Sequence, residues 1–182
     1  ADFIKIMATG GGTAGTISHK TAFTIAELAS AIDEAHSHGR LTAIHCLSSQ
    51  AMQDVVDSGG DMIIHGVFNT SDGQQVFDPR LADRIAKAAI PVNPTIHVRR
   101  IALKIAQQII DETEDEIQIL RKMGELQKNM QSDPDKIYMT PREFIHLLEK
   151  GFENRVDNAK NLREAGIKLI AGTDSGWGAY PV

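Results

Sequence analysis

The chain has 182 residues, of which 42% are hydrophobic and 24% are charged, and its formal net charge is -5. These values are typical of one globular domain. An acidic balance without a Lys/Arg-rich block argues against a nucleic-acid surface, and no apolar run approaches the ~20 residues that a membrane span needs. We therefore expect no nucleic-acid partner and no membrane partner. The chain has a single cysteine, Cys46, and no recognisable signal peptide, so we expect a cytoplasmic protein.

Short aliphatic runs recur along the chain, and each is bounded by turn residues, as buried parallel strands usually are. The predicted strands are residues 3–7, 41–46, 62–64, 90–93 and 168–171. Helical patterns separate them. The predicted helices are residues 24–37, 50–58 and 79–89, one or two long helices over 99–130, and further helix from 140 to 165. Such alternation predicts a parallel sheet, either doubly wound or part of a (β/α)8 barrel.

Local signals mark several of the helix starts. Thr24 with Glu27 three residues later forms a capping-box pattern, Ser49 is a candidate N-cap, and Asp78-Pro79 places proline in a first turn. Thr140-Pro141 repeats that pattern before the last helical region.

Four ionisable residues fall in or at the ends of predicted strands, in "FIKIMATGGG", "TAIHCLS", "MIIHGVF" and "LIAGTDSG": Lys5, His45, His65 and Asp174. A lone strand-end histidine is more often a hydrogen-bonded core residue, and a lone Asp174 is often a turn residue. Together they predict a shared site, because parallel strands end at one edge. Two imidazoles and a carboxylate are ordinary Zn²⁺ ligands, and a buried lysine can lose its proton and add CO2 to become an anionic carbamate.

This set, in this order, resembles the metal-dependent amidohydrolase superfamily, and most closely its imidazolonepropionase-like and Xaa-Pro or acyl-arginine dipeptidase-like branch. The resemblance implies a partial (β/α)8 TIM barrel, approximately strands 4 to 8. It implies that Lys5 (if carboxylated), His45 and His65 hold one divalent metal and that Asp174 belongs with a second. The family's His-x-His pair is absent. The nearest pattern, His36-Ser37-His38, lies at a predicted helix end, and we interpret it as a solvated terminus.

The resemblance also implies a function. We expect a zinc-dependent hydrolase, with one or two divalent metals, that cleaves an amide, cyclic amide or dipeptide bond with metal-activated water. Asp174 would be its catalytic general base and then acid. We expect residues 1–182 to be a single barrel fragment that lacks the first strands and the last helix, and to associate as a homo-oligomer. The alternative is a truncated half-barrel without catalysis.

The glycines of "ATGGGTAGT" allow other interpretations. A phosphate cradle would need a GxGxxG or GK[ST] pattern, which the chain lacks. A threonine amidase resembling the bacterial asparaginases would use Thr13 as its nucleophile, but that leaves His45 and His65 unexplained. We favour a third interpretation, in which the glycines let the backbone pass close to the metal or substrate. His19 and His97 are weaker candidates for substrate contacts.

Overall fold

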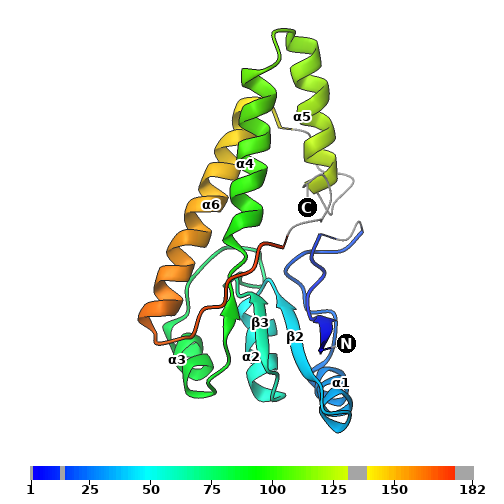
Figure 1. The fold of residues 1–182 in the computed structure, drawn as a ribbon, viewed down its shortest axis with the longest axis vertical. Helices are drawn as coiled ribbons and strands as arrows, with labels where there is room; N and C mark the ends of the chain where they lie inside the picture. Colours follow the sequence, from blue (N-terminus) through cyan, green and yellow to red (C-terminus); the bar gives the residue numbers. More distant parts are fainter. Residues whose placement is uncertain (1, 13–14, 131–138, 175–182) are drawn as a thin grey trace.

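The computed structural model describes residues 2–12, 15–130 and 139–174 (Figure 1). Its centre is a parallel sheet whose strands follow the sequence in space, β1-β2-β3-β4. The strands are β1 (Phe3–Met7), β2 (Leu41–Cys46), β3 (Met62–His65) and β4 (Val92–Asn93). The order does not reverse, as a doubly wound sheet would require. The parallel arrangement predicted from the sequence is therefore confirmed.

The fifth predicted strand, residues 168–171, is reduced to a single bridge. Leu169 pairs in parallel with Val92, and the amides of Val92 and Ile170 donate to Lys168 and Val92 at 3.0 and 2.9 Å. The segment continues the sheet beyond β4 in sequence order. The fold is thus an α/β fold that corresponds to part of a (β/α)8 barrel.

Three helices cover one face of the sheet: α1 (Ile25–Ser37), α2 (Ser49–Asp57) and α3 (Pro79–Lys87). The capping box of Thr24 and Glu27 and the Asp78 cap form as predicted. The predicted Ser49 cap is wrong, because the side chain of Ser48 accepts from the Ala51 amide and Ser49 is already helical. The hydroxyl of Ser48, one position before the predicted cap, accepts from an amide of the first turn that has no partner within the helix.

The register of the strands separates the two faces of the sheet. One row across all four strands, Ile6, Ile44, Ile63 and Val92, is buried against the helices. The next row, Met7, His45, Ile64 and Asn93, points to the opposite face, because side chains alternate along a strand. This second face is the one that carries the histidine.

The remaining helices form what we call the helical projection: α4 (Ile96–Asp111), α5 (Glu116–Met130) and α6 (Pro141–Glu164), whose last turns also pack on the sheet core through Leu162. α4 and α6 lie side by side (Figure 1), and apolar residues of all three helices, including Ala102, Met123 and Leu148, form a separate core. None of the helices in the described parts has the length and apolar character required for a membrane span.

Candidate metal and catalytic site

His45 lies near the end of β2 on the face that the helices leave uncovered. Its side chain is buried, and its Nε2 atom has no hydrogen-bond partner among the described residues. Burial lowers the pKa of His45 to about 4, and the nearby positive charges of Lys5 and Arg155 act in the same direction. The ring is therefore neutral at physiological pH and keeps a nitrogen that a cation can use.

His65 reaches the same place by an irregular route. Its Cα is in register with Cys46, whose thiol is in the core on the helix-covered face, so regular pleating would aim His65 at that face too. Instead His65 adopts a left-handed backbone conformation, with φ of 72°. Its ring lies edge to face with His45, with centroids 4.4 Å apart and planes 79° apart. The strand-end turn brings the two imidazoles together.

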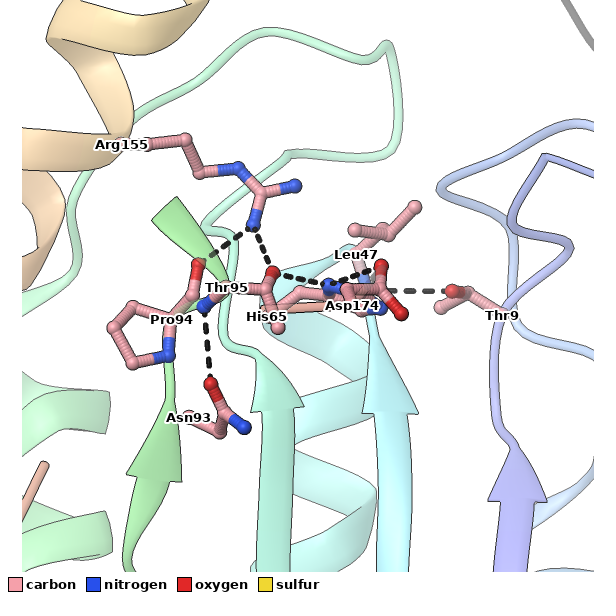
Figure 2. A network of polar contacts seen from close by, with 8 residues as sticks. All are labelled: Thr9, Leu47, His65, Asn93, Pro94, Thr95, Arg155 and Asp174. Atoms are coloured by element: carbon pink, nitrogen blue, oxygen red, sulfur yellow. Dashed lines mark hydrogen bonds and ion pairs between the residues drawn. The ribbon is translucent and has the colours of Figure 1, made fainter. Parts of the chain in front are cut away.

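Polar contacts hold the His65 ring from its Nδ1 side (Figure 2). Nδ1 lies 2.7 Å from Oγ1 of Thr95 and 3.9 Å from Oδ2 of Asp174. Arg155 donates to the Thr95 hydroxyl at 3.3 Å and to the Pro94 carbonyl at 3.1 Å. Burial, followed by the positive charge of Arg155, lowers the pKa of His65 to about 2. This imidazole is also neutral.

Lys5 and Asp174 complete the group through their charges. Lys5 is two residues from Met7, the register neighbour of His45, and so shares its face. Partial burial lowers the pKa of Lys5, although the negative charge of Asp174 opposes this shift. Burial raises the pKa of Asp174, against the opposing charges of Lys5 and Arg155. His65 thus contacts both His45 and Asp174, and the charge of Lys5 acts on all three of these residues.

Backbone strain gathers at this group. Among the described residues other than glycine, four have positive φ, and three of them, His65, Thr95 and Asp174, are linked by the contacts above. The fourth is Ala89. Each left-handed residue costs about 1–3 kcal/mol and persists only where surrounding contacts hold it. Such concentration of strain is characteristic of functional sites.

The imidazoles of His45 and His65 and the carboxylate of Asp174 are chemically suitable ligands for a divalent cation, but they are few. The buried Nε2 of His45 makes no hydrogen bond to any residue that the structure describes, and a neutral imidazole nitrogen is a common metal ligand. Yet among residues 2–12, 15–130 and 139–174, no three His, Cys, Asp or Glu side chains are grouped so that they could hold a metal. Lys5 is the nearby residue outside these four types whose charge acts on both histidines.

The glycine loop passes beside His45. A Cβ on Gly11, where φ is 63°, would lie 3.1 Å from Nε2 of His45 and 3.0 Å from Cε of Met7. The backbone therefore approaches the imidazole at a distance that only glycine permits without displacement. Thr13, the nucleophile of the threonine-amidase alternative, lies outside the described residues.

The other histidines have different surroundings. His19 packs over Gly73, where a Cβ would lie 3.0 Å from its ring, in the loop that follows β3. His97 is exposed on the first turn of α4. His36 and His38 are exposed at the end of α1, and their Nε2 atoms lie 2.8 Å from Asp61 and 3.0 Å from Glu34.

Three polar residues at the site escaped the sequence analysis: Thr95, Arg155 and Asn158. Asn158 donates to the carbonyl of Gly66, next to His65, at 2.7 Å. One signal was available, because Arg155 stands on the apolar stripe of α6, with Phe144, Leu148, Ala159 and Leu162. A charged residue on a buried helix face needs partners, and here they belong to the site.

Comparison with known proteins adds the family. The sequence profile described as "Amidohydrolase family" matches residues 1–179. No curated protein matches significantly. A solved Xaa-Pro dipeptidase with bound methionine superposes with a TM-score of 0.65 at 20% identity, over 99% of this chain and 36% of the other. A putative prolidase from Bifidobacterium longum gives 0.59 at 21% identity, over 100% and 36%. Ochratoxinase from A. niger gives 0.61 at 16% identity, over 98% and 32%. The chain thus spans about a third of the length of these structures.

Proposed function

The chain belongs to the amidohydrolase family. We therefore propose that the protein is a metal-dependent hydrolase of carbon–nitrogen bonds. The observation that carries this proposal is the buried, unpaired Nε2 of His45, beside a second neutral imidazole and the carboxylate of Asp174. A buried polar atom without a partner is costly unless a ligand satisfies it.

His45, His65 and Lys5 would hold the metal, and Asp174 would stand beside it. Zinc suits this mixture of imidazole and oxygen donors, and carboxylation of Lys5 would supply an anionic oxygen donor. A divalent metal, when bound, lowers the pKa of a water to about 7 and polarises the substrate carbonyl.

Asp174 would move the proton. Its raised pKa makes it a stronger base than an exposed aspartate, and its side chain is 40% exposed, so that water and substrate can reach it. It would accept the proton of the attacking water and deliver it to the leaving nitrogen. The positive charge of Arg155 opposes the rise in the pKa of Asp174 and so favours the ionised carboxylate that the first of these steps requires.

Substrates of this kind are small amides, cyclic amides or dipeptides. The Xaa-Pro dipeptidase and prolidase among the similar structures favour the dipeptide class. The test is hydrolysis of a panel of dipeptides, N-acyl amino acids and lactams by the full-length protein, with its metal content measured. A metal-loaded protein inactive on the whole panel would contradict the proposal.

A second candidate is a half-barrel that folds without catalysis. It is favoured by the absence, in the described parts of the chain, of three His, Cys, Asp or Glu side chains placed to hold a metal. Zinc titration of the purified 182-residue chain separates the two, because only the hydrolase proposal requires His45 and His65 to bind the ion.

A further inference from the structure

Helix α6 contacts the His65 turn with two buried polar side chains. Arg155 and Asn158 are 5% and 8% exposed and stand three residues apart, on one face of the helix. Burying a guanidinium is costly unless its donors are used. Both residues point from the helical projection to the strand ends.

Each side chain fixes a different part of the turn. Asn158 donates to the Gly66 carbonyl at 2.7 Å and so holds the backbone that follows His65. Arg155 donates to the Pro94 carbonyl and to the Thr95 hydroxyl, at 3.1 and 3.3 Å. Figure 2 shows the chain of contacts from Arg155 through Thr95 to the His65 ring.

The Thr95 hydroxyl stands between a permanent donor and an imidazole nitrogen. A hydroxyl has two lone pairs and one proton, and arginine can only donate. Arg155 therefore occupies one lone pair of Oγ1. The other lone pair can accept from Nδ1–H of His65, 2.7 Å away, or the hydroxyl proton can point to an unprotonated Nδ1.

The carboxylate of Asp174 decides between the two arrangements. Its Oδ2 atom lies 3.9 Å from the same nitrogen, so a proton on Nδ1 is favoured by a negative charge. In a neutral imidazole, a proton on Nδ1 leaves the lone pair on Nε2. An acceptor on one ring nitrogen is the usual device that prepares the other to bind a metal.

We propose that Thr95, anchored by Arg155, is a positioning residue that keeps His65 in the tautomer with its proton on Nδ1 and its lone pair on Nε2. The role of that lone pair as a metal ligand rests on the proposed function, whereas the tautomer itself does not. The helical projection thereby contributes to the site through residues that touch no substrate.

Two-bond ¹H–¹⁵N correlation spectra of the metal-free, ¹⁵N-histidine-labelled chain test the proposal at neutral pH. The His65 signals are assigned by their loss in His65→Gln. We expect the Nδ1–H tautomer in the natural sequence and in Thr95→Ser, which keeps the hydroxyl. Thr95→Val, of the same shape without the hydroxyl, and Arg155→Met should both lose this preference. Thr113→Val, which removes a buried hydroxyl that accepts from Lys122 in the projection, is the matched control and should change nothing.

An Nε2–H tautomer in the natural sequence overturns the proposal, even if a variant fails to fold, and so does a Thr95→Val spectrum identical to the unsubstituted one. Zinc titration is the second readout. Thr95→Val should weaken binding about 10–100-fold, as loss of a partner that orients a ligand usually does. A natural chain with the Nδ1–H tautomer supports the positioning role whether or not it binds zinc, whereas the proposed hydrolase is judged separately by the activity of the metal-loaded full-length protein.

Discussion

The rings of His45 and His65 meet edge to face, with centroids 4.4 Å apart, although the register of their strands assigns them to opposite faces of the sheet. The left-handed conformation of His65 resolves this conflict. Because the pair depends on one strained residue, its geometry is sensitive to every contact that supports that residue.

Replacement of His45 should remove metal from the chain. Loss of a residue that only orients a metal ligand weakens metal binding about 10–100-fold. His45→Gln removes the ligand itself, so we expect it to weaken zinc binding by at least this factor. His146→Gln, an exposed histidine of α6, is the control and should leave affinity unchanged. Calorimetric titration with metal analysis measures both. Equal affinities in the two variants would remove His45 from the metal site.

Asp174→Asn should separate turnover from metal binding. The amide keeps the size and one oxygen but cannot accept a proton, so kcat in the full-length protein should fall at least ~10²-fold while bound metal falls far less. Thr13→Ala should be mild. The same substrate and metal assay are used for both variants. An inactive threonine variant beside an active asparagine variant would favour the threonine-amidase alternative.

Gly11→Ala should disturb His45 as well as the backbone. A left-handed alanine costs about 1–2 kcal/mol, and here its Cβ would also lie 3.1 Å from Nε2 of His45. Gly39 has the same φ of 63° with open space around it, so Gly39→Ala measures the conformational cost alone. Urea unfolding should show the larger loss of stability in Gly11→Ala. Equal losses would mean that the loop moves away from the imidazole at little cost.

Asp61 should make the fold sensitive to acid. Burial opposes its ionisation, but hydrogen bonds from His36 and Thr42 outweigh this effect and lower its pKa. A depressed pKa adds stability above the unfolded value of about 3.9, and this stability is lost as pH falls through the folded value. Asp61→Asn should therefore be less stable at pH 7, with the difference shrinking below about pH 4. The exposed Asp33→Asn is the control in pH-dependent urea unfolding.

The 182-residue chain should associate in solution. In the described sheet β1 is an edge strand, and Phe3, Met7 and Leu41 are 52%, 41% and 60% exposed. Unpaired edges and apolar patches favour pairing between chains. We expect a homo-oligomer by light scattering after size exclusion, and weaker association for Met7→Lys. Ile117→Lys, 76% exposed on α5, is the control. A monodisperse monomer would contradict this prediction.

The sequence predicted the features that depend on neighbouring residues. The bounds of β1 and β2, the capping box at Thr24 and the parallel order of the strands all follow from local patterns. The turn of His65 does not, because the carbonyl of the next residue, Gly66, accepts from Asn158, which lies 92 residues further along the chain than Gly66. The segment 168–171 has the composition of a strand but only one bridge, since pairing needs a partner of matching length, and β4 has two residues.

The free thiol of Cys46, which follows His45 in β2, is fully buried, so its rate of chemical labelling can report how often this part of the core opens. Burial raises its pKa, so the closed state offers neither access nor thiolate to an alkylating reagent. Because the sequence has one cysteine, every labelling event reports an opening of the core around the end of β2. A metal ion that binds His45 and its neighbours stabilises the closed state and must slow this labelling. The alkylation rate of Cys46 therefore reports metal binding at His45, on the opposite face of the sheet.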